Sequence, residues 1–151
     1  MRSLQAKAVA KGKQGEREVV SLFLKCMHNV ESQLGRTHKY SERLKRNTTQ
    51  SDRGGFDIVG TPLLAVEVKY CETLQLDKWW EQCTAQAAKD GDNRLPVLFY
   101  RSNGKKWSVM TYVRMPTFNA SYTFVPGILN ANQFMDWYAV EYSAWLGRQE
   151  D

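Results

Sequence analysis

The stretch FDIVGTPLLAVEVKY, residues 56–70, decides the fold of this 151-residue chain. Two short apolar runs flank a Gly-Thr-Pro segment, a pattern that predicts two β-strands joined by a tight turn. Successive side chains of a strand alternate between its two faces. Glu67 and Lys69 therefore share one face of the second run, and its other face carries Leu64, Val66, Val68 and Tyr70. An acid and a lysine are costly to bury in an apolar strand, which indicates a site that uses them.

Asp57 lies ten residues before Glu67, on the first strand of this pair. Carboxylate oxygens are preferred ligands of hard cations such as Mg²⁺. Two carboxylates with a neighbouring lysine are therefore typical of a divalent-metal site. The alternative is an exposed ion pair between Glu67 and Lys69 on an edge strand, which would contribute little to stability.

The composition is that of one folded domain. Hydrophobic residues make up 42% of the chain and aromatic residues 12%, enough for a core and too much for a disordered protein. No apolar run approaches the ~20 residues that cross a bilayer, and the N-terminus lacks a signal-peptide core. We therefore expect an intracellular, cytoplasmic protein without membrane association. The cysteines are widely spaced, which predicts reduced structural thiols at Cys26, Cys71 and Cys83.

The net charge of +5 is unevenly distributed along the chain. Residues 1–53 contain twelve Lys and Arg against five Asp and Glu, whereas the remaining residues contain nine against eleven. A basic N-terminal third suits a polyanionic partner such as nucleic acid. The alternative is an ordinary solvated surface, and charge alone does not exclude it.

Apolar periodicity predicts the order helix, strands, helix, strands, helix, which is typical of an α/β or α+β layered fold. The last helix has a broad apolar surface rich in aromatic residues. The expected segments are a basic, frayed arm (1–11), a helix (13–30), a short strand (40–44), a loop (47–55), the strand pair, a helix (74–90), a hairpin (95–101 with 107–113), an irregular segment (116–127) and a helix (131–146).

Helix geometry selects a third acid. At ~100° per residue, Glu16 falls on the same face of the first helix as Val20 and Phe23, which are expected to be buried. Glu18 is turned about 200° from that face and is expected to point to solvent. The alternative for Glu16 is that it only stabilises the start of the helix through the macrodipole. That role does not explain why Glu16 lies on the inward face.

Three segments resemble the signature elements of archaeal-type Holliday junction resolvases, which belong to the PD-(D/E)xK nuclease superfamily. They are KGKQGERE at 11–18, FDIV at 56–59 and VEVK at 66–69, and the similarity extends over residues 10–115. The residue before Asp57 is Phe56 rather than the proline that names the superfamily, and the segment after residue 116 does not match.

The resemblance implies an α/β, restriction-endonuclease-like core, in which helices flank a central mixed β-sheet, with an extra C-terminal helix. It implies one nuclease domain, divided into a basic arm (1–11), a core (12–115) and an extension (116–151). It also implies roles for the acids: Asp57 and Glu67 would bind Mg²⁺, or Mn²⁺ as a substitute, with the Val68 carbonyl, and Glu16 would be a further ligand.

Lys69 would orient the attacking water or neutralise charge on the phosphate. A lysine has an ordinary pKa near ~10.4, so a role as general base would require a large depression, and the electrostatic role is favoured. Candidate DNA contacts are the basic or polar residues around this centre: Lys11, Lys13, Arg17, Arg46, Ser51, Arg53 and Gln82.

The sequence therefore predicts a metal-dependent DNA endonuclease, selective for branched DNA such as Holliday junctions and acting in recombination or repair. Symmetric cuts across a four-way junction need two active sites, so this hypothesis includes a homodimer, for which the aromatic C-terminal helix is a candidate surface. Two alternatives stay open: a restriction-like or repair nuclease acting on other DNA, and a nucleic-acid-binding module that keeps the fold without cutting.

Overall fold

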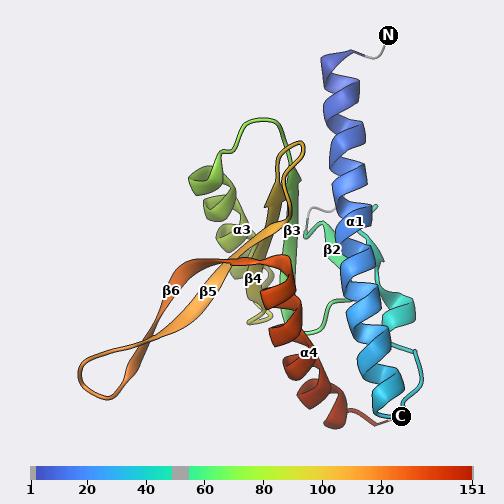
Figure 1. The fold of residues 1–151 in the computed structure, drawn as a ribbon, viewed down its shortest axis with the longest axis vertical. Coiled ribbons are helices and arrows are strands. Elements are labelled where there is room, and N and C mark those ends of the chain that lie inside the picture. Colours follow the sequence, from blue (N-terminus) through green and yellow to red (C-terminus); the bar gives the residue numbers. More distant parts are fainter. Residues whose placement is uncertain (1–2, 49–54, 151) are drawn as a thin grey trace.

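The computed structural model describes residues 3–48 and 55–150, which form a six-stranded mixed sheet with helices on both faces (Figure 1). The helical segments are α1 (Leu4–Gln33), the 3₁₀ turn η1 (Ser41–Arg43), α3 (Leu76–Asp90) and α4 (Ala131–Gly147). The strands are β1 (Lys45–Arg46), β2 (Ile58–Val59), β3 (Leu64–Tyr70), β4 (Leu95–Arg101), β5 (Ser108–Pro116) and β6 (Tyr122–Asn130).

The strands lie in the sheet in their order along the chain. β3 and β4 run parallel, with α3 as the connection between them, and every other neighbouring pair runs antiparallel. The expected fold class, an α/β core with a central mixed sheet and a C-terminal helix, is therefore confirmed. β3 lies inside the sheet between β2 and β4, so the alternative of an ion pair on an edge strand is wrong.

The two faces of the sheet have separate apolar clusters. On one face, α1 and α4 cover the larger cluster, and Phe23 lies at its centre with ring contacts to Phe99, Phe134 and Tyr138 at 5.3–6.3 Å. On the other face, α3 places Trp79 and Cys83 against β4. The alternation along β3 follows from this arrangement, because its apolar residues contribute to the larger cluster while Glu67 and Lys69 point the opposite way.

Helix α1 begins earlier than the sequence predicted. Ser3 caps it by accepting a hydrogen bond from the Ala6 amide at 3.1 Å, and the helix then runs for 30 residues. The expectation of a frayed arm is therefore wrong for residues 4–11, which form its first turns. Of the two residues expected to be buried, Phe23 is fully buried and Val20 is half-buried.

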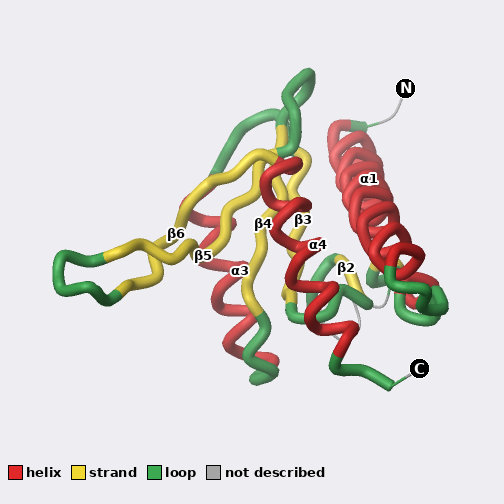
Figure 2. Tube along the Cα trace, turned by 60° about the horizontal axis from the view of Figure 1, so that its bottom comes forward, coloured by secondary structure: helices red, strands yellow, loops and turns green. Residues whose placement is uncertain are grey.

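Two other segments differ from expectation. The strand predicted at 40–44 is replaced by η1 and the short strand β1. The segment 116–127, predicted as irregular, contains the end of β5 and the first part of β6. β5 and β6 pair along nine registered residues and form a long hairpin that extends away from the helices (Figure 2).

Helix α4 begins with a capping box, in which Asn130 and Gln133 exchange side-chain and backbone hydrogen bonds. Only one stripe of the predicted broad apolar surface is buried, and Trp137 and Val140 are exposed. The buried stripe consists of Phe134, Tyr138, Tyr142 and Leu146. This stripe joins the same cluster as α1, whereas the division into a core and an extension at residue 116 stays a prediction.

A fully buried acid, Glu31, joins α1 to its neighbours, and no sequence pattern predicted its burial. Its carboxylate accepts hydrogen bonds from the Ser41 amide at 3.0 Å and the Tyr142 hydroxyl at 2.8 Å, and His38 Nδ1 lies 3.2 Å away. Burial alone would raise the pKa of Glu31, but these hydrogen bonds together outweigh it and lower the pKa. Glu31 is therefore an ionised anchor for the 38–41 turn and for α4.

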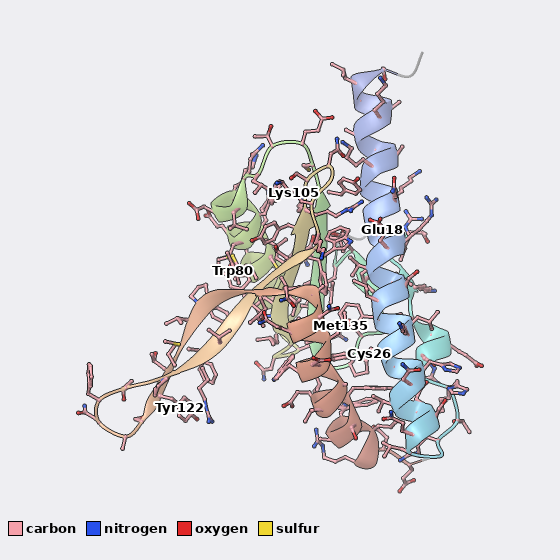
Figure 3. The ribbon with its side chains drawn as sticks, viewed as in Figure 1. Glu18, Cys26, Trp80, Lys105, Tyr122 and Met135 are labelled. Atoms are coloured by element: carbon pink, nitrogen blue, oxygen red, sulfur yellow. The ribbon has the colours of Figure 1, made fainter. Side chains whose placement is uncertain are left out.

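The three cysteines are free thiols, as predicted. Cys26 lies between α1 and α4, with its sulfur 3.8 Å from the Met135 carbonyl (Figure 3). Within the described part of the chain, no helix combines the length and hydrophobicity needed to cross a membrane.

Candidate active site

A groove of about 580 Å³ lies where the first half of α1 passes the end of β3. It brings together segments that are far apart in the sequence: α1, the residues after β1, the residue before β2, and β3 with its following residue. Its walls are formed by Ala8, Val9, Gly12, Lys13, Glu16, Arg17, Arg46, Asn47, Thr48, Asp57, Val68, Lys69, Tyr70 and Cys71.

Asp57 is held rigidly at the floor of this groove and is only 8% exposed. Its amide donates to the Val66 carbonyl at 3.1 Å, and its own carbonyl accepts from the Asn47 amide at 2.8 Å. Its Oδ2 accepts a hydrogen bond from the Val68 amide at 2.7 Å. Backbone pairing with β3 thus fixes the Asp57 carboxylate beside the residues that follow Val66.

Glu67 faces Asp57 from β3. Burial raises the pKa of Glu67 strongly, and the charge of Asp57 and a hydrogen bond with its side chain raise it further. Lys69 acts in the opposite direction, and Glu16 adds to the increase. Glu67 therefore keeps its proton to a higher pH than an ordinary glutamate, and the two carboxyl groups are close enough to share it.

Glu16 approaches the same centre from α1. Burial raises its pKa, the Asp57 charge raises it further, and Arg46 opposes both through its charge and a hydrogen bond. The nearest Arg46 nitrogen lies 3.3 Å from Glu16 Oε2. The predicted inward facing of Glu16 is therefore observed, and the three acids come from three separate segments of the chain.

Close packing at Gly15 lets α1 approach β3 at this level. A Cβ atom on Gly15 would lie 2.9 Å from Tyr70 Cβ, closer than real Cβ atoms come, and 3.2 Å from the Trp107 ring, which is tighter than most real Cβ contacts. Gly15 directly precedes Glu16, and Tyr70 directly follows Lys69. The small residue therefore allows the helix to carry Glu16 up to the lysine and the acids of β2 and β3.

Glu18 does not point to solvent, and that prediction is wrong. Its side chain is 34% exposed, and Oε1 lies 3.2 Å from Nη2 of Arg101 at the end of β4. Figure 3 shows Glu18 on the side of α1 that faces the sheet. Arg101 also stacks over Tyr70 at 4.2 Å and donates to the Lys105 carbonyl. The sequence missed this pair because α1 is sandwiched between β1 on one side and the β4–β5 end on the other, so two of its faces are covered.

The predicted DNA contacts separate into three groups. Lys13, Arg17 and Arg46 line the groove, and their contact with DNA stays a prediction. Lys11 lies beside the groove and pairs with Glu72 at 3.3 Å, while Gln82 is exposed on α3 and is not among the residues that line the groove. Ser51 and Arg53 lie outside the described residues.

Two residues near the acids were missed by sequence reasoning. Asn47 donates from Nδ2 to the Phe56 carbonyl at 2.8 Å and thereby holds the backbone directly before Asp57. Cys83, buried on α3, has its pKa raised by burial first and by the charges of Glu67 and Asp57 next, so it presents a neutral thiol to the acids. Neither belongs to a sequence pattern, since both reach the site through tertiary packing.

The donor set fits a hard divalent cation. In the described ranges, 3–48 and 55–150, no three His, Cys, Asp or Glu side chains are already grouped as a metal site. In this arrangement Glu16 is paired with Arg46, and Asp57 Oδ2 accepts the Val68 amide. The Asp57–Glu67 pair nevertheless offers only oxygen donors, and a cation would relieve the repulsion that raises the pKa of Glu67.

One of three comparisons with known proteins gave a match. Neither the curated proteins nor the solved structures gave a match to this chain. A protein family described as "Phage putative PDDEXK endonuclease" matches residues 7–145, which include all four residues Glu16, Asp57, Glu67 and Lys69. The match supports the PD-(D/E)xK superfamily of metal-dependent nucleases and not its archaeal resolvase branch. The chain therefore belongs to the phage putative PDDEXK endonuclease family.

Proposed function

We propose that this chain is a Mg²⁺-dependent endodeoxyribonuclease whose active centre consists of Glu16, Asp57, Glu67 and Lys69. One observation carries the proposal: acids from α1, from the residue before β2 and from β3 lie close together, with a lysine beside them, so that the charge of Asp57 adds to burial in raising the pKa values of both Glu16 and Glu67. A protein gains no stability from such a group, because acids that face acids destabilise the fold.

In this proposal, Asp57, Glu67 and the Val68 carbonyl hold Mg²⁺, or Mn²⁺ in its place, and Glu16 contributes directly or through water. The bound cation would lower the pKa of an attacking water and stabilise the charge that develops on the phosphate. Lys69, on the groove wall, neutralises part of that charge. Arg46 would exchange its contact with Glu16 for a phosphate oxygen when DNA enters.

DNA would lie along the groove beneath the first half of α1. Lys13 and Arg17 line this part of the groove, and Lys11 is adjacent. Phosphate contacts of this kind give affinity without sequence specificity and weaken steeply with salt. Ser51, Arg53 and Gln82 are kept as further candidate contacts, on the sequence argument alone.

We further propose branched DNA, such as a four-way junction, as the preferred substrate, with a homodimer as the cutting species in DNA recombination or repair. The support is the resemblance of the 11–18, 56–59 and 66–69 segments to resolvase motifs. A restriction-like or repair nuclease on unbranched DNA is the alternative within the same chemistry.

One gel experiment tests the nuclease activity, its metal dependence and its preference for branched DNA separately. End-labelled four-way junction, flap and linear duplex are incubated with the protein and Mg²⁺, Mn²⁺ or EDTA. We expect cleavage with either metal, none with EDTA, and the fastest cleavage on the junction. Asp92→Asn is the matched control for carboxylate variants of the proposed site, because it removes a carboxylate from an exposed surface pair with Arg94.

The possible results have different consequences. Equal cleavage of all three substrates would refute the branched-DNA proposal and leave the nuclease proposal standing. Binding without cleavage under every metal condition would refute the nuclease and favour a non-cleaving DNA-binding module. Cleavage that persists in EDTA would refute the metal-dependent mechanism.

A further inference from the structure

We propose that the β5–β6 hairpin, here called the arm (residues 108–130), is a docking surface for a second copy of this chain. Figures 1 and 2 show the arm extending away from the helices in both orientations. In Figure 3, Tyr122 lies far out on the arm, on the opposite side of the molecule from Glu18 and the groove. The proposal gives a surface to the homodimer suggested above, and it does not depend on the nuclease chemistry.

The arm carries a continuous apolar stripe on one face. Cross-strand partners of an antiparallel pair project to the same face, and the register pairs Tyr112 with Pro126, Arg114 with Phe124, and Pro116 with Tyr122. Six of the fourteen large hydrophobic residues that are exposed in the described chain belong to the arm. Those on this face, 37–59% exposed, are Tyr112, Tyr122, Phe124 and Ile128.

The stripe is ordered before any partner binds. Tyr122 and Phe124 make an edge-to-face contact at 5.5 Å, and Tyr112 makes another with Trp80 of α3 at 5.2 Å. Arg114 lies over the Tyr122 ring at 4.7 Å. Rings that are already fixed lose little conformational entropy on binding, so the stripe is suited to a specific contact.

The low charge of the arm indicates the kind of partner that it binds. Arg114 is the only charged residue between Trp107 and Asn130. A surface for nucleic acid would need several cations, as α1 has along the groove. An apolar, nearly uncharged stripe instead fits another apolar, nearly uncharged stripe, and a second copy offers an identical one. Two such stripes related by a two-fold axis make a self-complementary contact without like-charge repulsion along most of their length.

The contact uses the face of the arm rather than its edge. β6 is an outer strand of the sheet, and an unpaired edge can add a strand from another chain. Pro126 lies in the middle of β6 and has no amide hydrogen, which removes one donor from such a pairing. The exposed rings are therefore the available means of association.

The test measures the mass of the full chain in solution, without metal or DNA. Analytical ultracentrifugation across a dilution series should give a species of twice the 17.4 kDa chain mass. The double variant Tyr122→Glu, Phe124→Glu should raise the dimer dissociation constant at least about 100-fold. A milder variant, Tyr122→Ser with Phe124→Ser, should act in the same direction, and circular dichroism checks that each variant is folded.

Val140→Glu on α4 is the matched control, because Val140 is equally apolar and exposed on the rival surface suggested by the sequence. It should leave the dimer intact. The proposal is overturned if the natural chain is monomeric throughout, if the folded arm variants still dimerise, or if Val140→Glu alone dissociates the dimer. Loss of DNA binding in the arm variants at unchanged mass would also overturn it, since the arm would then contact DNA. Because no cleavage is measured, failure of the nuclease proposal cannot be confused with any of these results.

Discussion

Two inward-facing acids of helix α1, Glu16 and Glu31, lie in opposite electrostatic surroundings. Near the middle of the helix, Glu16 faces Asp57, and Asp57 in turn faces Glu67. Near its C-terminal end, Glu31 faces only donors, from Ser41, Tyr142 and His38. The pKa of Glu16 is raised, chiefly by burial, whereas the pKa of Glu31 is lowered although it is completely buried.

The difference shows how a structural acid can be told from one that awaits a ligand. Glu31 has its partners inside the protein, so its charge is stabilised by the fold that it helps to hold. Glu16, Asp57 and Glu67 have one another as neighbours, and Arg46 and Lys69 only partly offset the burial and repulsion that raise the pKa values of Glu16 and Glu67. A carboxylate cluster that the fold itself does not satisfy is a better indicator of a cation site than burial alone.

Among the variants that compare the candidate site with Glu31, Glu67→Gln is expected to have the largest effect. Loss of one cation ligand should lower DNA cleavage by about 10³-fold or more, since several kcal/mol of transition-state stabilisation are removed. Burial and the Asp57 charge raise the pKa of Glu67 to about 9, so without metal near neutral pH the change replaces a neutral carboxyl by a neutral amide, and the thermal stability should be unchanged. Cleavage is measured with Mg²⁺ at saturating DNA, and stability is measured by thermal unfolding without metal.

The comparison between the two regions would fail if Glu67→Gln cut DNA normally, or if it were strongly destabilised. Either result would mean that Glu67 is an anchor of the fold like Glu31. Asp92→Asn, from the exposed pair with Arg94, should affect neither quantity.

Glu31→Gln should show the reverse behaviour. Ser41 and Tyr142 both donate to Oε2, so the amide oxygen can replace that acceptor, while the NH₂ group takes the place of Oε1 beside His38 Nδ1 and the negative charge is lost. Because hydrogen bonds to a charged acceptor become bonds to a neutral one, we expect the free energy of unfolding to fall by about 1–2 kcal/mol. Where the variant is folded, its cleavage rate should match that of the natural chain. Urea unfolding gives the first quantity and the gel assay gives the second; an unchanged stability would refute the role assigned to Glu31.

The effect of Glu31 should also depend on pH in a defined direction. Because its pKa is lower in the folded state than the ordinary value of 4.5, the unfolded chain takes up a proton first as the pH falls. The stabilisation is therefore fully present above pH 4.5 and is lost as the pH falls through the lowered pKa. The difference in unfolding free energy between the natural chain and Glu31→Gln should narrow in acid. A difference that stays constant from neutral to acidic pH would show that Glu31 is not ionised in the fold.

The fold could be predicted from local patterns where those patterns were strong. The alternation in residues 64–70 and the buried stripe of α1 gave the correct layers, because each element buries the face that its own sequence makes apolar. The strand predicted at 107–113 is observed in β5, but the outer part of the arm, residues 116–127, could not be predicted in this way. β5 and β6 bury little of their outer parts, so their apolar residues follow no inward–outward alternation beyond Val113, and the segment resembled an irregular loop.

The site was predictable to the extent that its residues recur in a motif. Asp57, Glu67 and Lys69 stand at characteristic spacing, and the facing of Glu16 followed from helix geometry. Asn47 and Arg46 could not be assigned contacts, because their partners Phe56 and Glu16 are brought near only by the tertiary fold. Glu31 was passed over for the same reason: its donors come from η1 and α4, and nothing local distinguishes it from an acid at a helix end.

The smallest effect is expected for Glu18→Gln, which tests how firmly α1 is held beside the groove. Glu18 pairs with Arg101 through one oxygen, and its other oxygen, Oε2, finds no hydrogen-bond partner among the described residues. Arg101 stays anchored without Glu18, because it stacks on Tyr70 and Trp107 and donates to the Lys105 carbonyl. The loss in unfolding free energy should therefore stay below about 1 kcal/mol.

The cleavage rate of Glu18→Gln should fall less than tenfold, through a small shift of the α1 turn that carries Glu16. If that is the route, adding Glu18→Gln to a Glu16→Gln chain should cause no further loss, because the two changes act on one group. Single-turnover cleavage by the natural chain, both single variants and the double variant measures this directly. Additive losses would mean that Glu18 acts independently of Glu16, and a loss equal to that of Glu16→Gln would mean that the wrong acid of α1 has been assigned to the groove.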